Sequence, residues 1–121
     1  LPLPEATAYM LMSYPVHEDK LDLIPAAVHV DGTARLQAVH RGLNPLFHRL
    51  IKGFGERTNV PVLVNTSFNI RGEPIVCTPE DAYLCMMGTG IDCTVLGRSL
   101  IRRDDNPDDE WDSSARSRAD N

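Results

Sequence analysis

The polar side chains between positions 65 and 71 are the residues of this sequence best suited to bind an anion. Asparagine, threonine and serine donate hydrogen bonds to phosphate or carbonyl oxygens, and arginine adds a cation that can hold two oxygens at once. These residues are Asn65, Thr66, Ser67, Asn69 and Arg71, and Gly72 follows them as a flexible position. The sequence therefore predicts an anion site at this loop.

A second polar cluster lies in the string HVDGTAR at positions 29–35. Asp31 and Gly32 favour a tight turn, and Thr33 and Arg35 supply donors directly after it. Ligands of open sheets collect at the ends of strands. We therefore expect Arg35 and the loop at positions 65–71 to bind one anion together.

Both clusters also have a structural interpretation. Asparagine, threonine, serine and glycine are the usual residues of turns, so the loop at positions 65–71 is open to a purely structural role. In the other cluster, Asp31 is able to cap its own turn, and Arg35 to pair with Glu73 or Asp81. The sequence leaves these alternatives open.

The net charge of -5 is concentrated at the carboxyl end. Residues 104–121 contain six Asp and one Glu against two Arg, so residues 1–103 are balanced. Without a basic surplus, nothing favours a nucleic-acid-binding surface. We expect one domain over residues 1–103 and an acidic, disordered tail over 104–121, in which Trp111 is either solvated or a contact for a partner.

No segment predicts a membrane span, a disulfide framework or a metal site. The sequence has no stretch near the roughly 20 apolar residues that a membrane-spanning helix needs. Cys77, Cys85 and Cys93 are odd in number and form no CxxC pair, and the four histidines show no metal-ligand spacing. We expect a cytoplasmic protein with reduced cysteines in its core. The first residue is not Met, which indicates a piece of something longer.

Apolar runs predict several strands. The first four cover residues 8–14, 26–30, 34–40 and 61–65, and the second and third form a hairpin at Asp31 and Gly32. The unbroken apolar run at 61–65 is typical of a strand covered on both faces. Two closing strands, 92–96 and 99–102, flank Gly97.

Two helices are predicted from their capping residues. Asn44 and Pro45 fit the N-cap and first position of a helix that runs to about Arg57. Thr78 begins a second helix, with Asp81 completing a capping box and a glycine ending it. Strands mixed with two helices predict an α/β or α+β fold with a mixed sheet.

The string HVDGTARLQAV, followed by NPLFHRLIKGFGERTNVPVLVNTSFNIRGEPIVCTPEDA, resembles the carboxyl-terminal domain of the carbamoyltransferase family. These enzymes are similar to nodulation-factor and antibiotic O-carbamoyltransferases, and the resemblance covers roughly residues 8–101. It implies a YrdC-like fold that forms carbamoyl adenylate from carbamoyl phosphate and ATP with Mg²⁺. A separate, metal-binding Kae1-like domain would then carbamoylate an acceptor hydroxyl.

The resemblance also implies roles for individual residues. Ser67 and Asn69 match the serine and asparagine of a Lys, Arg, Ser, Asn tetrad that binds triphosphate and metal, and Arg35 matches an arginine that holds carbamoyl phosphate. We therefore expect Arg35, Ser67 and Asn69 to be catalytic. Further substrate or nucleotide contacts are expected from His29, Asp31, Thr33, Asn65, Thr66 and Arg71. Catalysis of this kind depends on positioning and charge stabilisation and needs no nucleophilic side chain.

Parts of the family pattern have no counterpart in this sequence. They are the lysine and arginine of the tetrad, a basic GPRALG-type segment and the Kae1-like domain with its metal. We expect the chain to need that missing domain or a partner chain, to bind nucleotide weakly alone and to turn nothing over. An unpaired sheet edge is expected as well. The alternatives are a non-catalytic module that binds carbamoyl phosphate or nucleotide, and an inert fragment.

Overall fold

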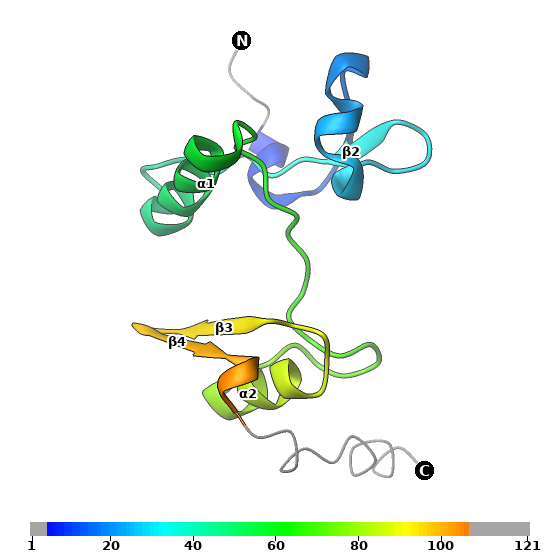
Figure 1. Ribbon diagram of the computed structural model, residues 1–121. Coiled ribbons are helices and arrows are strands. Elements are labelled where there is room, and N and C mark those ends of the chain that lie inside the picture. Colours follow the sequence, from blue (N-terminus) through cyan, green and yellow to red (C-terminus); the bar gives the residue numbers. More distant parts are fainter. Residues whose placement is uncertain (1–4, 107–121) are drawn as a thin grey trace. The chain divides into compact units, whose positions relative to one another are not determined.

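The computed structural model describes residues 5–106, which divide between Asn65 and Thr66 into two compact units. The first unit contains strands β1 (Ser13–Pro15) and β2 (Thr33–Arg35) and helix α1 (Pro45–Thr58) (Figure 1). The second contains helix α2 (Pro79–Met87) and strands β3 (Cys93–Leu96) and β4 (Ser99–Arg102). Short 3-10 helices are η1 (Glu5–Tyr9), η2 (Glu18–Leu23), η3 (Pro25–Ala27) and η4 (Arg103–Asp105).

The fold is a small α+β fold, as predicted from the mixture of strand and helix patterns. Among the described residues, β1 pairs only with β2 and β3 pairs only with β4, each antiparallel. The strands therefore form two separate ladders instead of one mixed sheet. A mixed sheet would need parallel pairs, and none forms within residues 5–106.

Contacts continue the β1–β2 ladder beyond its last pair, Ser13 with Arg35. The backbone N–H of Ala38 donates to the carbonyl of Thr7 at 2.8 Å, and Gln37 Nε2 donates to the carbonyl of Ala8 at 3.3 Å. Residues 35–38 therefore run alongside residues 7–10. This pairing fixes the position of the segment that carries Arg35.

Several predicted strands are wrong. The predicted strand 8–14 is confirmed only at its end, where Ser13 and Tyr14 belong to β1, since it begins in η1. Residues 26–30 begin inside η3, and residues 61–65 have no regular secondary structure. The segment 34–40 is a strand only at its start. Apolar composition favours burial, but a strand also needs a neighbouring backbone to pair with. The hairpin predicted at the Asp31–Gly32 turn is likewise wrong, because β2 pairs with β1.

Helix α1 is confirmed, including its N-cap. Asn44 Oδ1 accepts a hydrogen bond from the backbone N–H of Phe47 at 3.2 Å, and Pro45 occupies the first helical position. The helix ends at Thr58, and the C-cap residue Asn59 has a left-handed conformation with φ 60°. Gly55 then lets the chain fold back, because a Cβ atom there would lie 2.7 Å from Cβ of Pro61. The helix thus positions the segment that leads to Asn65.

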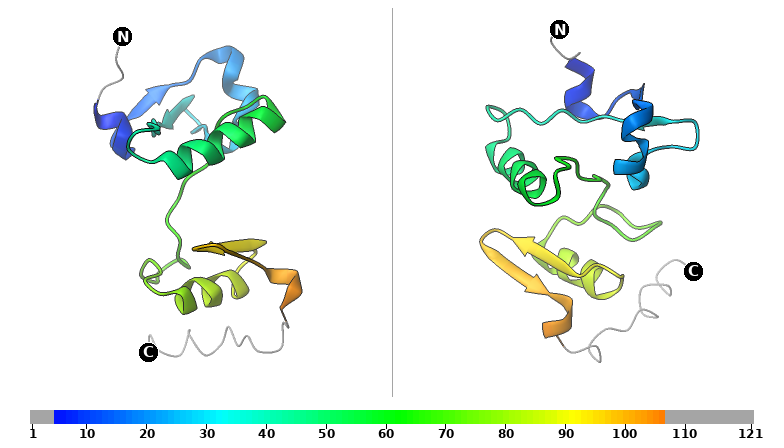
Figure 2. Two further views of the ribbon diagram at one scale, coloured as in Figure 1. Left: turned by 90° about the vertical axis from the view of Figure 1, so that its left-hand side faces the viewer. Right: turned by 45° about the horizontal axis from the view of Figure 1, so that its top comes forward.

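In the second unit, α2 lies along the β3–β4 hairpin (Figure 2). The predicted capping box is present: Thr78 Oγ1 accepts from the N–H of Asp81 at 3.1 Å, and Asp81 Oδ2 accepts from the N–H of Thr78 at 3.0 Å. Among the described residues 66–106, the buried apolar side chains all come from α2: Ala82, Cys85, Met86 and Met87. The two closing strands predicted around Gly97 are confirmed, and they form a hairpin that turns at this glycine, whose φ is 62°.

The cysteine prediction is correct for only one residue of the three. All three cysteines are free, and Cys85 is buried, but Cys77 and Cys93 are exposed. Successive side chains of a strand point to opposite faces, and β3 has Thr94 buried. Its neighbour Cys93 therefore faces outward.

Within residues 5–106, no helix is long and apolar enough to cross a bilayer, and no three metal-ligating side chains gather. Of the predicted acidic tail, Asp104 and Asp105 belong to η4, and Asn106 Nδ2 donates to the carbonyl of Arg102 at 2.6 Å. The remainder of that tail, including Trp111, lies outside the described residues.

Candidate functional site

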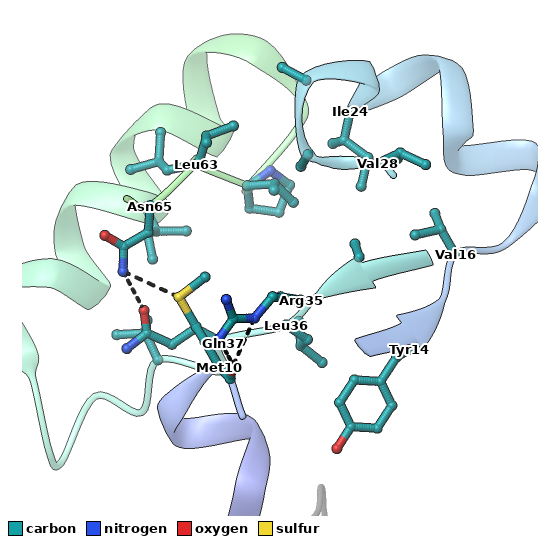
Figure 3. A pocket seen from close by; sticks show the side chains of 18 of the residues that line it. Met10, Tyr14, Val16, Ile24, Val28, Arg35, Leu36, Gln37, Leu63 and Asn65 are labelled. Atoms are coloured by element: carbon teal, nitrogen blue, oxygen red, sulfur yellow. Dashed lines mark hydrogen bonds between the residues drawn. The ribbon is translucent and has the colours of Figure 1, made fainter. Parts of the chain in front are cut away.

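The first unit contains a pocket of about 470 Å³ between β2, α1 and the segment at positions 61–65. Apolar side chains form most of its wall, among them Val28, Leu36 and Leu63 (Figure 3). The polar lining residues include His29, Arg35, Gln37 and Asn65. The pocket therefore combines an apolar wall with a small number of polar groups, as ligand sites commonly do.

Arg35 is held in place by the backbone of the residue after η1. Its Nε and Nη2 atoms both donate to the carbonyl oxygen of Met10, at 3.1 and 2.8 Å. The guanidinium remains exposed, and Nη1 makes no hydrogen bond within residues 5–106. The Nε–Nη2 edge of the guanidinium is thus anchored, and its Nη1 group is available to an anion.

Asn65 lies in the same pocket and is joined to the segment that carries Arg35. Its Nδ2 atom donates to Gln37 Oε1 at 2.7 Å and to the sulfur of Met10 at 3.7 Å (Figure 3). The structure therefore brings together Arg35 and Asn65, which the sequence assigned to one site. Met10 is shared by both residues and holds them on one side of the pocket.

Sequence reasoning missed Gln37 and Met10 as positioning residues. A signal for Gln37 was present, because residues two apart in an extended segment lie on the same side, and Gln37 follows Arg35 at that spacing. Met10 gave no signal. It holds Arg35 through its carbonyl oxygen, which does not depend on its side-chain type, and contacts Asn65 through its sulfur, a weak acceptor.

The turn from His29 to Thr33 is closed by side-chain hydrogen bonds. Asp31 Oδ1 accepts from the backbone N–H of Thr33 at 3.0 Å and from its hydroxyl at 2.7 Å. Thr33 Oγ1 also lies 3.0 Å from Nδ1 of His29. Asp31 thus caps its own turn, and Gly32 adopts a φ of 78° that suits glycine. The hydrogen bonds from Thr33 lower the pKa of the Asp31 carboxyl below its usual value.

In the second unit, the loop at positions 66–73 is organised by Asn69. Its Nδ2 atom donates to the carbonyl oxygens of Ile70 at 3.0 Å and Glu73 at 2.9 Å. Thr66, Ser67 and Arg71 are exposed in this loop. Arg35 belongs to the first unit and these residues to the second, so their convergence on one anion stays a prediction.

A family model described as Carbamoyltransferase C-terminus matches residues 3–103 of the chain. The chain belongs to this carbamoyltransferase family. The match contains all the predicted site residues in both units. The resemblance inferred from the HVDGTAR and NTSFN strings is therefore confirmed at the level of the family.

Named relatives of this segment include two nodulation proteins and a cephem O-carbamoyltransferase. It is 43% identical over 85% of its length to nodulation protein NolNO of Sinorhizobium fredii, and 40% identical over 95% to NolO of Bradyrhizobium diazoefficiens. It is also 40% identical over 64% of its length to a 3'-hydroxymethylcephem-O-carbamoyltransferase of Amycolatopsis lactamdurans. These matches cover 15, 22 and 15% of the respective relatives. The chain thus spans about a fifth or less of their length.

Proposed function

We propose that this chain contributes to an adenylate-forming site of an O-carbamoyltransferase. In that site water cleaves carbamoyl phosphate to carbamate and phosphate, and a carbamate oxygen attacks the α-phosphorus of ATP to give carbamoyl adenylate and pyrophosphate. The carbamoyl group then passes to an acceptor hydroxyl with release of AMP. The observation that supports the proposal best is the pocket of the first unit, where Arg35 and Asn65 share Met10 as a hydrogen-bond partner.

Arg35 is suited to hold the phosphate of carbamoyl phosphate. Its Nε and Nη2 bonds to Met10 fix the plane of the guanidinium, and the free Nη1 group presents two N–H donors to a ligand. Because a guanidinium is a cation, its hydrogen bonds to phosphate oxygens are charge-assisted. A donor that is already oriented also loses little freedom when the ligand binds.

The loop of the second unit offers oxygen atoms of the kind that Mg²⁺ and triphosphate use. Ser67 is exposed, and Asn69 directs its nitrogen at the loop backbone, which leaves its Oδ1 atom without a partner among residues 5–106. Mg²⁺ prefers oxygen ligands and is commonly bound together with substrate phosphates. These two residues fit ATP with its Mg²⁺, which would neutralise charge on the phosphates. Thr66 and Arg71 would add contacts to the nucleotide.

A second candidate function is binding without reaction, and the contacts of Asn69 favour it. Both hydrogen atoms of its amide are used to close the loop, so this residue also has a structural role. A module built this way would hold carbamoyl phosphate or nucleotide and leave the reaction to residues of another domain or chain. The Kae1-like domain, its metal and the acceptor site would then belong to that partner.

The test uses a chimeric enzyme, because the relatives are several times longer than the chain. Residues 3–103 would replace the corresponding family segment of the cephem O-carbamoyltransferase, and carbamoyl transfer and carbamoyl-phosphate-dependent exchange of pyrophosphate into ATP would be measured. We expect both activities in the chimera. Removal of one oriented donor in Ser67→Ala should lower them by about a hundredfold or more.

Ser99→Ala is the matched control, because Ser99 is an exposed serine on β4. It should leave both activities of the chimera unchanged. A folded chimera that binds carbamoyl phosphate but catalyses neither reaction would support the binding module instead. A chimera equally active with and without the Ser67 hydroxyl would contradict the assigned role of that residue.

A further inference from the structure

Three side chains of the turn at positions 29–33 form a continuous hydrogen-bonded chain. The Thr33 hydroxyl is its central member, 2.7 Å from Asp31 Oδ1 and 3.0 Å from His29 Nδ1. Two backbone bonds tighten the same turn: the N–H of His29 donates to the Thr33 carbonyl at 2.7 Å, and the N–H of Gly32 donates to the His29 carbonyl at 3.0 Å. The distance between the imidazole and the carboxylate is therefore set by the backbone as well as by the side chains.

The direction of each bond in this chain is determined by the chemistry of its members. An ionised carboxylate can only accept, so the single hydroxyl proton of Thr33 is donated to Asp31. The lowered pKa of Asp31 is consistent with an ionised acceptor. The Thr33 oxygen then has only lone pairs left for His29. Its partner Nδ1 must therefore carry a proton, and in the neutral imidazole the lone pair is on Nε2.

The Nε2 atom of His29 makes no hydrogen bond within residues 5–106. His29 lines the same pocket as Arg35. Thr33 and Arg35 are two residues apart on β2, so their side chains lie on the same face of the strand. Thr33 thus holds the imidazole on the face that also carries the guanidinium. The pocket that both residues line therefore has a hydrogen-bond acceptor from His29 and cationic donors from Arg35.

We propose that His29 Nε2 accepts a hydrogen bond from the amino group of carbamoyl phosphate while Arg35 binds its oxygens, so that the turn selects a carbamoyl over an acetyl group. The inference rests on the proposed function for the identity of the ligand. It adds a specificity-determining residue, His29, and two positioning residues, Thr33 and Asp31.

The carbamoyl amino group is the part of this ligand that suits such an acceptor. Its N–H groups donate and it has no basic lone pair, because that pair is delocalised into the carbonyl. Acetyl phosphate has the same shape and the same phosphate but carries a methyl group in this place. Inorganic phosphate lacks the acyl group altogether. A neutral histidine with its lone pair fixed on Nε2 therefore distinguishes carbamoyl phosphate from both.

The first test concerns the proton position and needs no ligand. Nitrogen NMR of the 121-residue chain, recorded where titration shows the ring to be neutral, should find the His29 proton on Nδ1. Thr33→Val removes the oxygen that accepts this proton and should shift His29 toward the Nε2–H form that a free imidazole favours. Thr33→Ser keeps the hydroxyl and should keep the Nδ1–H form. An Nε2–H imidazole in the wild-type chain would overturn the proposal.

The second test measures ligand selectivity by titration with carbamoyl phosphate, acetyl phosphate and inorganic phosphate. A single hydrogen bond at this exposed site should make carbamoyl phosphate bind about three- to tenfold more tightly than acetyl phosphate. His29→Phe and Thr33→Val should bring this ratio close to one, and Thr33→Ser should preserve it. Equal affinities in the wild type, or a ratio that His29→Phe leaves unchanged, would overturn the proposal.

The same titrations distinguish failure of the proposed function from failure of the inference about His29. If none of the three phosphates bound to the chain, carbamoyl phosphate would be excluded as the ligand of this pocket, and the selectivity inference would fail with it. If carbamoyl phosphate bound but did not exceed acetyl phosphate, the binding function would stand and only the role of His29 would be lost.

Discussion

The carboxamide of Asn65 donates a hydrogen bond of 2.7 Å to the carboxamide oxygen of Gln37. The two residues are far apart in the sequence, and each belongs to a segment that carries predicted site residues. Gln37 in turn donates to the carbonyl of Ala8. Three segments of the first unit therefore meet at this pair, and Arg35 is anchored to the same place through Met10.

The pair should contribute measurably to stability. A hydrogen bond between neutral groups is worth about 0.5–1.5 kcal/mol net, and residues in direct contact show coupling. We expect Asn65→Ala and Gln37→Ala to destabilise the chain less together than the sum of their separate effects. Urea unfolding of the two variants and the double variant measures this coupling. Arg41→Ala is an exposed control and should combine additively with Asn65→Ala; strict additivity for the pair itself would contradict the contact.

Alanine substitutions of two glycines of α1 should change the stability of the chain in opposite directions. At Gly55 a Cβ atom would lie 2.7 Å from Cβ and 2.9 Å from Cα of Pro61, so the returning segment must shift. Overpacking of this kind costs about 1–3 kcal/mol. At Gly53 the added Cβ meets nothing within 4 Å, and alanine should stabilise the helix by up to about 1 kcal/mol.

Thermal unfolding of both variants measures this difference. We expect the unfolding temperature to fall for Gly55→Ala and to rise for Gly53→Ala. If both substitutions shifted it upward, the close approach of Pro61 to the helix would be refuted. The comparison also tests whether α1 fixes the start of the segment that leads to Asn65.

The Asp31 carboxyl should titrate below the value of an unperturbed aspartate. Its pKa is lowered from 3.8, first by the hydroxyl of Thr33 and then by the backbone N–H of the same residue. Because the folded pKa is the lower one, the ionised carboxylate stabilises the turn above pH 3.8, and this contribution is lost as the pH falls through the folded pKa. Thr33→Val should raise the pKa, and Thr33→Ser should preserve it.

Carbonyl-detected NMR of the carboxyl group follows this titration residue by residue. A midpoint at or above 3.8 for Asp31 in the wild-type chain would disagree with the hydrogen bonds seen at the turn. A midpoint that did not respond to Thr33→Val would assign the shift to another cause.

The parts of the fold that the sequence predicted correctly have strong local signals. Asn44 with Pro45, and Thr78 with Asp81, place donors and acceptors within one helical turn, so the helix starts are encoded in a few adjacent residues. The β3–β4 hairpin is equally local, because its strands are joined at Gly97. The failures concern pairing over longer distances. The partner of β2 is β1 rather than the nearer segment 26–30, and this choice depends on contacts that no short window contains.

In the candidate site, too, the features with local sequence signals were predicted and those that depend on distant contacts were not. The two strings of polar residues were sufficient to identify the candidates, and the turn chemistry of Asp31 and Gly32 was sufficient to predict a tight turn. The anchoring of Arg35 was not predictable, because it uses a backbone carbonyl, which every residue has. The position of each proton in the hydrogen bonds that join His29, Thr33 and Asp31 was not predictable from the sequence either. It follows from which atoms lie within hydrogen-bond distance of one another.

The central claim is that Arg35 binds carbamoyl phosphate in the pocket of the first unit, and titration of the chain with this compound tests it most directly. NMR of the labelled chain should show shifts at Arg35 and Asn65. Arg35→Lys keeps the charge but loses the planar guanidinium that can bind two oxygens at once, and should weaken binding about tenfold or more. Arg41→Lys, an exposed control, should bind as the wild type does. Equal affinities in Arg35→Lys and the wild type, with shifts located away from the pocket, would contradict the account.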